Sequence, residues 1–382
     1  QWPKEQSRSI SWSPAGSRRN IMEQTIKVKT ALHSSDIKIA SKSLKQLAIY
    51  LRQVWSKRQV ALITDTNVGL LYVQKIKQQL VAAGYPTEVL TITAGEKSKS
   101  WGQLEKLIDR LAAAHFSRTD GIIALGGGVV GDLAGLVASL YLRGISVIQI
   151  PTSLLAQVDS SVGGKTAIDL PAGKNLVGTF YQPDLVLIDP TTLQTLPDRL
   201  VAEGYGEVVK CAAMVGGSFW QLTEQIKTIA DIRHFAGQLI AASVVFKADV
   251  VTHDEPETHQ RQLLNFGHTL GHAVDKAAAG RLFHGEAVAI GMYQLCRLFE
   301  QQKLTAQGTT EKLADRLLAV GLPLNDPTLN TPAFYAALQH DKKIRHDQLT
   351  LIYLKKIGQP DFYPRPLQEV IDFLQKNLSK NS

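Results

Sequence analysis

The chain has 382 residues, of which 44% are hydrophobic and 20% charged, and its formal net charge is +8. These values are ordinary for a globular protein, and the length is sufficient for two domains that each bury a core. The sequence has no block of like charge, no aromatic-interleaved basic run and no apolar run of about 18 residues, so neither nucleic acid nor a membrane is an expected partner. The mildly basic balance favours anionic small substrates, phosphates especially.

Residues 1–21 have no hydrophobic periodicity and supply +3 of the net charge. They lack the apolar region of a secretory signal, and Met22 looks like the natural start. We therefore expect them to form a disordered or non-native tail. Cys211 and Cys296 lie in apolar, helical-looking sequence and are expected to be buried free thiols of a cytoplasmic protein.

From residue 22 to 197 the pattern alternates between strands and helices. The predicted strands are Lys27–Thr30, Asp36–Ala40, Gln59–Thr64, Thr87–Ile92, Gly121–Leu125 and Val147–Ile150. Helices are predicted over Leu70–Ala83 and Trp101–Ala114, and a further helix is predicted at Gly126–Asp132, which directly follows the strand Gly121–Leu125. Strands that alternate with helices of 10–15 residues indicate a parallel sheet covered on both faces.

Beyond about residue 200 the strand signals nearly vanish. Long helical patterns dominate, apart from one late strand-like piece at Leu349–Leu354. The sequence therefore predicts an α/β nucleotide-binding domain with a parallel sheet over 22–197. A mostly α-helical domain that binds metal and substrate is predicted over 198–382.

A glycine-rich turn, Gly126–Gly131 (GGGVVG), fits the pattern G-x-G-x-x-G after a strand and at a helix start. Such glycines let the backbone approach a pyrophosphate, although tight strand–helix packing is the alternative explanation. The turn follows a later strand than in the usual dinucleotide fingerprint, and no acid follows about 20 residues on. Asp65, at the end of Gln59–Thr64, is the better candidate for binding a ribose hydroxyl, but a helix N-cap explains it nearly as well.

A second polar segment, Gln157–Thr166 (QVDSSVGGKT), is expected to be a loop. It lacks the spacing of a P-loop, but its glycines, lysine and hydroxyls suit an anionic, polyhydroxylated ligand. Lys174 and Asn175, after another glycine, repeat this chemistry. Together these segments indicate a sugar-phosphate pocket.

Three histidines fall within seventeen residues: His268, His272 and His284. The first two are spaced i, i+4, so on a helix both imidazoles project from one face. Imidazole is both a good metal ligand and, with a pKa near ~6.5, a good proton carrier. Surface or capped histidines are the alternative, but three so close together favour a divalent-metal site or an acid/base cluster.

These segments, together with Glu203–Lys210 (EGYGEVVK), resemble 3-dehydroquinate synthase, a sugar-phosphate cyclase family of the shikimate pathway. The resemblance runs in order from Met22 to the end of the chain. It implies that Glu207, His268 and His284 hold a zinc or cobalt ion, and such a set also suits a catalytic divalent site with open positions. It further implies an NAD cofactor bound by Asp65, Asn67, Glu96, Lys99, Gly127, Gly128, Val129, Asp132, Thr152, Ser153 and Lys174. Ser153 departs from the threonine of many relatives but keeps the hydroxyl.

The resemblance also implies a sugar-acid substrate site. Its residues would be Asp159, Lys165, Asn175, Lys210, Lys247, Arg261, Asn265 and His272, with Arg143 reaching the phosphate pocket across a homodimer interface. Asp341–Lys343 matches a late motif whose lysine contacts substrate, and both Lys342 and Lys343 fit that position.

The reaction implied by the resemblance converts 3-deoxy-D-arabino-heptulosonate 7-phosphate into 3-dehydroquinate and phosphate. Transient oxidation of the C5 hydroxyl by NAD is followed by phosphate elimination, re-reduction, ring opening and an aldol closure. His272 is expected to manage a proton. The cationic side chains would stabilise the departing phosphate.

Three alternatives remain open at this point. A metal-dependent polyol dehydrogenase would share the two-domain plan, but four lysines (Lys165, Lys174, Lys210 and Lys247) would have nothing to bind on a simple alcohol. Another sugar-phosphate cyclase would differ in the sugar, although Asn175 and Asn265 match the dehydroquinate synthase pattern. An inactive, NAD-sensing protein would have lost a metal ligand or a substrate lysine, and here all are present.

Overall fold

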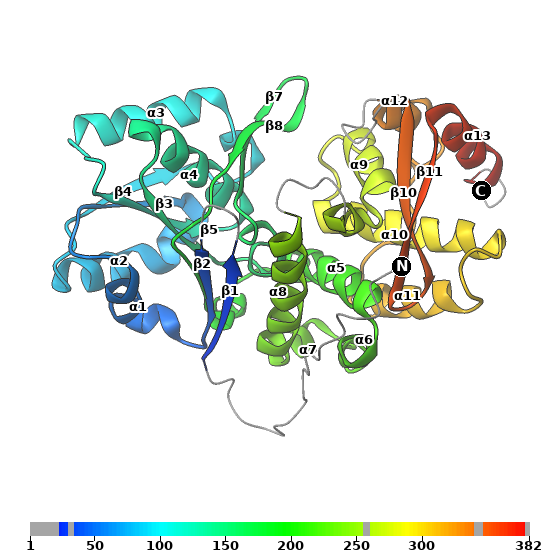
Figure 1. The fold of residues 1–382 in the computed structure, drawn as a ribbon, viewed down its shortest axis with the longest axis horizontal. Coiled ribbons are helices and arrows are strands. Elements are labelled where there is room, and N and C mark those ends of the chain that lie inside the picture. The colour runs from blue at the N-terminus through cyan, green and yellow to red at the C-terminus, as the bar shows by residue number, and fades with distance from the viewer. Residues whose placement is uncertain (1–22, 30–33, 255–259, 340–346, 379–382) are drawn as a thin grey trace. The chain divides into compact units, whose positions relative to one another are not determined.

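The computed structural model describes residues 23–29, 34–254, 260–339 and 347–378 (Figure 1). They divide into two compact units. The α/β unit comprises 23–197 with 236–254, and the helical unit comprises 198–235 with 260–378. None of the helices within these ranges has the length and apolar character needed to cross a membrane. The 1–21 tail and the Asp341–Lys343 motif lie outside the described residues.

The α/β unit is built on a seven-stranded sheet with the order β1-β2-β9-β6-β5-β3-β4. Its strands are Gln24–Lys29 (β1), Ser34–Ile39 (β2), Val60–Asp65 (β3), Thr87–Ile92 (β4), Gly121–Gly126 (β5), Ser146–Pro151 (β6) and Leu185–Ile188 (β9). Strand β1 pairs antiparallel with β2, and the other pairs are parallel. The predicted parallel sheet is confirmed.

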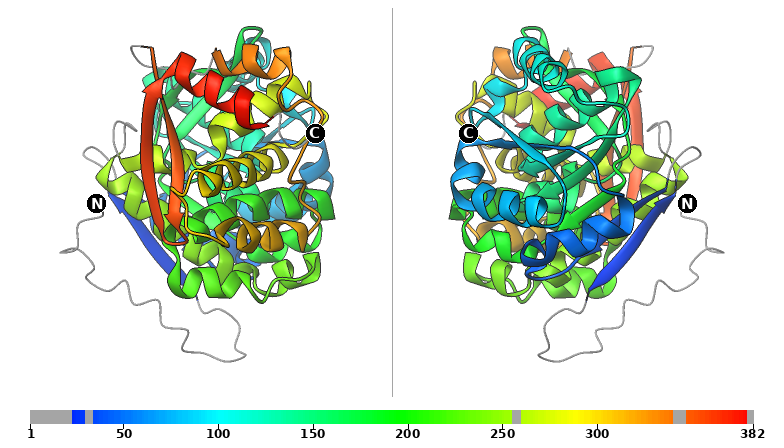
Figure 2. Two further views of the ribbon diagram at one scale, coloured as in Figure 1. Left: turned by 90° about the vertical axis from the view of Figure 1, so that its right-hand side faces the viewer. Right: turned by 90° about the vertical axis from the view of Figure 1, so that its left-hand side faces the viewer.

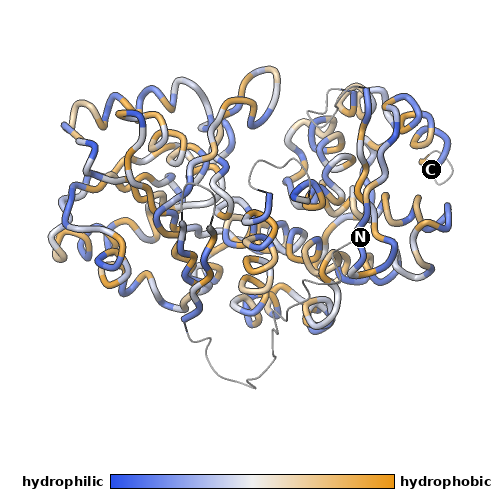
Figure 3. The backbone as a smooth tube through the Cα atoms, in the orientation of Figure 1, coloured by the Kyte–Doolittle hydropathy of each residue, from blue (hydrophilic) through white to orange (hydrophobic). Residues whose placement is uncertain are grey.

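Helices cover both faces of this sheet because its central strands are apolar on both sides. The helices are α1 (Leu47–Val54), α2 (Thr66–Ala82), α3 (Trp101–Ala113) and α4 (Gly128–Leu140). Within β3, Ala61 and Ile63 pack in the core formed with α3 and α4, whereas Val60 and Leu62 pack in the core formed with α1 and α2. Alternate residues of a strand point to opposite faces, so one short apolar run supplies two cores. The central strands accordingly appear hydrophobic in Figure 3.

Sequence patterns did not predict three strands of this unit. Two of them, Lys165–Leu170 (β7) and Gly173–Phe180 (β8), form an antiparallel hairpin apart from the main sheet. The third, β9, is a strand of the main sheet. The expected loop over Gln157–Thr166 is therefore wrong at its ends: Ala156–Ser160 (η4) forms a helical turn, and β7 begins at Lys165. Side chains fix the hairpin, since the Thr166 and Thr179 hydroxyls lie 2.9 Å apart.

Helix α8 (Ala236–His253) belongs to the α/β unit, where it packs against β1 and η4. The chain first passes from the α/β unit into the helical unit between Pro197 and Asp198. The chain then returns to the α/β unit for α8 alone. Nothing in the helical pattern of Ala236–His253 distinguishes it from helices of the other unit, since its buried face depends on the partner it finds.

The helical unit carries most of the remaining helices and one hairpin. Its elements are α5 (Asp198–Val215), α6 (Gly217–Thr223), α7 (Ile229–His234), η6 (Gln260–Asn265), α9 (His268–Ala277), α10 (His284–Gln301), α11 (Thr309–Leu318), α12 (Pro332–Gln339), β10 (Gln348–Lys356), β11 (Gln359–Pro366) and α13 (Leu367–Leu378). The mostly helical character predicted for this part is confirmed.

The late strand-like piece is one half of an antiparallel hairpin, which Figure 2 shows as a long two-stranded ribbon. Its partner β11 was not predicted because three prolines interrupt the strand pattern. Proline lacks a ladder donor and is tolerated only where a strand edge is left unpaired, as in this two-stranded sheet. Cys211 on α5 and Cys296 on α10 are buried free thiols, as predicted.

Candidate functional site

Four neighbouring parallel strands of the α/β unit end at one edge of the sheet, and the predicted cofactor residues follow these ends. The chain proceeds from β3 outward to β4, and then returns to β5 on the other side of β3. Ligands of open α/β sheets bind at such a switch in strand order, outside the carboxyl ends of the strands. The residues that follow the ends of β3, β4, β5 and β6 are Asp65, Asn67, Glu96, Lys99, Gly127, Gly128, Val129, Thr152 and Ser153.

The glycine-rich turn joins β5 to α4, on one side of this switch. A Cβ on Gly126 would lie 2.5 Å from Val130 Cγ2, and a Cβ on Gly131 would lie 2.6 Å from Gln149 Oε1. These two glycines therefore serve close packing. A Cβ on Gly127, by contrast, would make only an ordinary contact of 3.4 Å with Ser153 Oγ. A Cβ on Gly128, the first residue of α4, would lie 3.0 Å from Ser160 Oγ, so Gly127 is the glycine of this turn with the most room for a ligand at the helix N-terminus.

Asp65 lies at the end of β3 and is the N-cap of α2. Its Oδ1 accepts hydrogen bonds from the backbone N–H groups of Asn67 (2.8 Å) and Val68 (2.9 Å). The N-cap interpretation of Asp65 is thus observed directly. Both cap bonds use Oδ1 rather than Oδ2, and Asp65 lies on the opposite side of the switch from the glycine-rich turn.

Lys99 is the centre of a buried polar cluster at the same edge. Its ammonium lies 2.8 Å from Asp132 Oδ2 and 3.5 Å from Glu96 Oε1, and donates to the Asn175 side-chain oxygen. Burial opposes the charge on Lys99, but Asp132 and Glu96 hold its pKa above the usual value. Asp169, which sequence reasoning did not select, fixes Asn175 by accepting its backbone N–H at 2.8 Å. The cluster joins three predicted cofactor residues to a predicted substrate residue.

Asp159 and Lys247 form another charged contact in the α/β unit. Lys247 extends from α8 and donates both to the backbone oxygen of Asp159 (2.6 Å) and to its Oδ1 (2.5 Å). Lys165 is the first residue of β7, and Lys174 lies on β8, so the hairpin presents both ammonium groups. Arg143 follows α4 and has an exposed side chain and a positive φ of 66°.

In the helical unit, Glu207 and the three histidines form one cluster. Helix α5 provides Glu207, α9 provides His268 and His272 one turn apart, and α10 begins at His284. The Nε2 atoms of His268 and His284 lie 3.5 and 3.6 Å from Glu207 Oε1. The predicted i, i+4 pair on one helix face is confirmed, and its ring centroids are 5.3 Å apart.

The Glu207 carboxylate is buried, and neither of its oxygens accepts a hydrogen bond from the residues that the structure describes. The ammonium of Lys210, which is also buried, forms an ion pair with this carboxylate. His268 Nδ1 donates to the backbone oxygen of Phe266 at 3.2 Å, which leaves Nε2 as a lone-pair donor facing Glu207. A carboxylate and imidazole nitrogens that converge in this way fit a divalent cation.

His272 gives the cluster a second possible ligand set. The ligand atoms of His268, His272 and His284 all lie within 4.8 Å of one another. The geometry therefore offers either three imidazoles, or two imidazoles with Glu207. Arg261 and Asn265 lie on η6, just before α9, and the Arg261 side chain is only 1% exposed.

Sequence reasoning missed the residues that hold the first turn of α10. Burial raises the pKa of Glu203 to about 7, and the nearby backbone N–H groups of Gly285 and His284 oppose this shift. Glu286 forms an ion pair with Arg199. The available signal was the motif His284-Gly-Glu286, because an acid in the first turn of a helix stabilises its N-terminus.

Arg281 holds the segment before α10 through a two-pronged ion pair with Asp326, at 2.8 and 3.0 Å. Burial alone would raise the pKa of Asp326, but hydrogen bonds from Arg281 and Thr328 outweigh it and lower the pKa to about 2. A lowered pKa contributes stability above the unfolded-state value, and that stability disappears as the pH falls through the folded-state value.

Asp326→Asn is therefore expected to reduce the free energy of unfolding by about 1–2 kcal/mol near pH 7, a figure discounted because Arg281 is half exposed. The difference from the wild type should shrink between pH 4 and 2. Urea unfolding of both proteins at several pH values measures it. A difference that stays constant over this range would contradict the assignment.

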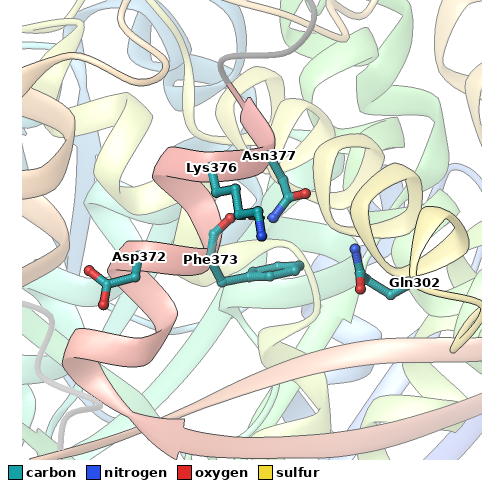
Figure 4. A pocket seen from close by; sticks show the side chains of 5 residues that line it. All are labelled: Gln302, Asp372, Phe373, Lys376 and Asn377. Carbon is teal, nitrogen blue, oxygen red and sulfur yellow. Dashed lines mark hydrogen bonds between the residues drawn. The ribbon is translucent and has the colours of Figure 1, made fainter.

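A separate surface pocket of about 350 Å³ lies in the helical unit and is lined by Gln302, Asp372, Phe373, Lys376 and Asn377. Figure 4 shows the ring of Phe373 extending toward Gln302, which follows the end of α10. None of these residues belongs to the predicted site. One acid and one base give the pocket no net charge, so it does not extend the candidate site.

Comparisons with known proteins cover most of the chain. The family model for the 3-dehydroquinate synthase N-terminal region matches residues 89–203, and that for the C-terminal region matches 204–344. The 3-dehydroquinate synthase of Lactiplantibacillus plantarum is 60% identical over 339 residues, which cover 89% of this chain and 94% of that protein.

Two solved structures resemble the chain over 92% of its length. One is a 2-deoxy-scyllo-inosose synthase complexed with carbaglucose-6-phosphate, NAD⁺ and Co²⁺, with a TM-score of 0.84, 27% identity and all of that chain covered. The other is ValA, a 2-epi-5-epi-valiolone synthase from Streptomyces hygroscopicus with NAD⁺ and Zn²⁺ bound, with a TM-score of 0.83, 26% identity and 99% of that chain covered.

Proposed function

The chain belongs to the 3-dehydroquinate synthase family, and from this premise we propose which of its side chains carry the reaction. The chain converts 3-deoxy-D-arabino-heptulosonate 7-phosphate into 3-dehydroquinate and phosphate, and it depends on NAD and a divalent metal ion. The single observation that carries the site proposal is the buried Glu207 carboxylate, with two imidazole nitrogens facing one of its oxygens.

Glu207, His268 and His284 hold the metal ion, which is zinc or cobalt. When bound, such an ion acts as a Lewis acid on substrate hydroxyls. The two imidazole ligands are neutral, so Glu207 supplies the negative charge of the ligand set. That charge favours the binding of a divalent cation. Lys210 pairs with the same carboxylate and so lies where a substrate bound at the metal would meet a cation.

The α/β unit binds NAD at the switch in strand order. When bound, NAD would supply a reversible hydride acceptor, and the overall reaction has no net redox change. Gly127, Gly128 and Val129 receive the pyrophosphate at the start of α4, while Asp65 and Asn67 receive the adenosine ribose. The Lys99–Asp132–Asn175 contacts, with Glu96, Thr152, Ser153 and Lys174 at the same edge, orient the remaining part of the cofactor.

The remaining cationic and polar side chains bind the substrate's carboxylate, hydroxyls and phosphate. Lys165, Lys247 and Arg261 neutralise anionic groups, and Asp159 fixes the Lys247 ammonium. Asn175 and Asn265 accept hydrogen bonds from substrate hydroxyls through their side-chain oxygens and donate to them through their side-chain N–H groups. His272 takes up and returns a proton at a ring nitrogen, close to the metal ligands but not bound to the ion.

We also propose a cytoplasmic homodimer in which Arg143 contributes to the partner's phosphate pocket. Support comes from Arg143, an exposed cation just after α4, and from two buried free thiols, which suit a reducing compartment. Sedimentation equilibrium tests the dimer, and a monomer at micromolar concentration would contradict it.

The reaction itself is tested by following phosphate release and absorbance at 340 nm together, with the heptulosonate phosphate, catalytic NAD and zinc or cobalt. Phosphate far in excess of NAD, without accumulation of NADH, is expected. Accumulation of NADH without phosphate would instead identify a dehydrogenase.

His272→Ala is expected to lower kcat by 10²- to 10⁴-fold while the bound metal is retained, since the side chain carries a proton rather than the ion. Metal content by atomic emission and turnover by phosphate release measure the two effects separately. Loss of metal from this variant would favour the set of three imidazoles and would contradict the role proposed for Glu207.

A further inference from the structure

The first turn of α10, which begins with His284, is held from the side by α5. The guanidinium of Arg199 binds both carboxylate oxygens of Glu286, with Nε–Oε1 at 2.7 Å and Nη2–Oε2 at 2.8 Å. Nη2 also donates to the backbone oxygen of Arg281 at 3.1 Å, and Cζ lies 4.3 Å from the centroid of the Phe283 ring. One side chain of α5 thus contacts three residues between positions 281 and 286.

Glu203, one turn further along α5, occupies the N-terminus of α10. The residue is only 8% exposed, and its carboxylate lies near the backbone N–H groups of Gly285 and His284, which lower its pKa against the effect of burial. The approach is close, since a Cβ on Gly285 would lie 2.0 Å from the Glu203 backbone oxygen. Glu286 completes the arrangement by accepting the backbone N–H of Phe283 at 2.8 Å.

Arg199, Glu203 and Glu207 are spaced by four residues, so they lie along one side of α5. One side of α5 therefore carries Glu207, a proposed metal ligand. It also carries Arg199 and Glu203, which contact the first turn of α10, where the proposed ligand His284 lies. We propose that Arg199, Glu203 and Glu286 are positioning residues that hold His284 at its distance from Glu207. This proposal rests on the assignment of Glu207 and His284 as metal ligands.

The contacts are suited to positioning rather than to stabilisation. The Arg199 side chain is 55% exposed, and exposed ion pairs contribute little to the free energy of unfolding. Its two-pronged geometry nevertheless fixes the orientation of Glu286. Groups that orient metal ligands typically change metal affinity by about 10- to 100-fold when removed. Loss of Arg199 should therefore appear in metal binding much more than in unfolding.

The test is a titration of the metal-free protein with Co²⁺, followed by its visible absorption bands and by competition with a chelator. Arg199→Gln and Glu203→Ala are expected to weaken Co²⁺ binding by about 10- to 100-fold and to change the band pattern. Glu203→Gln keeps an acceptor for the backbone N–H groups and should recover most of the affinity. Thermal unfolding of each metal-free variant shows that it is folded.

Asp198→Asn is the matched control. It removes the ion pair of Asp198 with Arg233 (2.7 Å) from the residue next to Arg199 on the same helix. Its Co²⁺ affinity and spectrum should equal those of the wild type. A loss as large as that of Arg199→Gln would show a general disturbance of α5 and would overturn the proposal.

Glu207→Gln separates failure of this proposal from failure of the site assignment. If Glu207→Gln loses Co²⁺ while Arg199→Gln and Glu203→Ala bind it with wild-type affinity and spectrum, only the positioning role is overturned. Because Arg199 lies on the surface, its variants keep the test valid if Glu203→Ala does not fold. If Glu207→Gln itself binds Co²⁺ as the wild type does, the site assignment fails and the positioning role fails with it.

Discussion

Glu207→Gln is expected to remove the metal ion and to lower kcat/KM by at least about 10³-fold, because an isosteric neutral amide replaces the only anionic ligand. The carboxylate is buried between two imidazole Nε2 atoms and Lys210, so no water-exposed acid can substitute for it. In this variant the buried Lys210 ammonium has a neutral amide beside it instead of a carboxylate. Its uncompensated positive charge then disfavours a metal cation at the site.

Metal content after dialysis and turnover at saturating zinc or cobalt measure this prediction. Glu300→Gln is the matched control, because Glu300 lies in the same unit. Its carboxylate accepts hydrogen bonds from the backbone N–H groups of Gly308 (2.7 Å) and Thr310 (2.8 Å). It should cost about 1 kcal/mol of stability and leave metal content unchanged. Full metal content and activity in Glu207→Gln would disprove the ligand assignment.

Gly285→Ala is expected to reduce the free energy of unfolding by about 3–5 kcal/mol, or to shift the start of α10. The new Cβ would lie 2.0 Å from the Glu203 backbone oxygen and 2.8 Å from its carbonyl carbon. Backbone atoms cannot rotate away as a flexible side chain can, so one helix must move. That movement would carry the neighbouring His284 away from Glu207, and metal affinity should fall together with stability.

Urea unfolding and Co²⁺ titration measure the two effects. Gly102→Ala tests the same chemical change without a steric conflict, because nothing lies within 4 Å of its ideal Cβ and it lies in the first turn of α3. This control should be neutral or stabilising by about 0.5–1 kcal/mol. If Gly285→Ala matched it, the close approach of α5 and α10 would be wrong.

The central α/β fold could be predicted because β3, β5 and β6 are short apolar runs, and such runs reflect burial on both faces wherever they occur. The β7–β8 hairpin could not, since many of its residues are polar or exposed and its pairing depends on contacts such as Thr166–Thr179. Strand β11 carries three prolines, and its hydrogen bonds are available only because β10 lies beside it.

The candidate site divides in the same way. The spacing of His268 and His272 predicts a shared helix face, because both lie on one element. Glu207 lies 61 residues before His268, and only the family resemblance brought them together. Neither kind of reasoning gave a role to Arg199, or to Glu203 at the start of the Glu203–Lys210 motif, because a contact between a side chain of one helix and the first turn of another leaves no local pattern.

Because α8 returns to the α/β unit, this unit cannot complete its folding during synthesis until α8 has left the ribosome. The sheet strands are complete once β9 has been made, yet the helix that packs on β1 and η4 arrives only with residues 236–253. Domains generally fold as units during synthesis. The α/β unit must therefore wait, with β1 and Asp159 uncovered, while the 38 residues from 198 to 235 emerge. A nascent chain stalled soon after residue 197 should be a better chaperone substrate than one stalled well beyond 253.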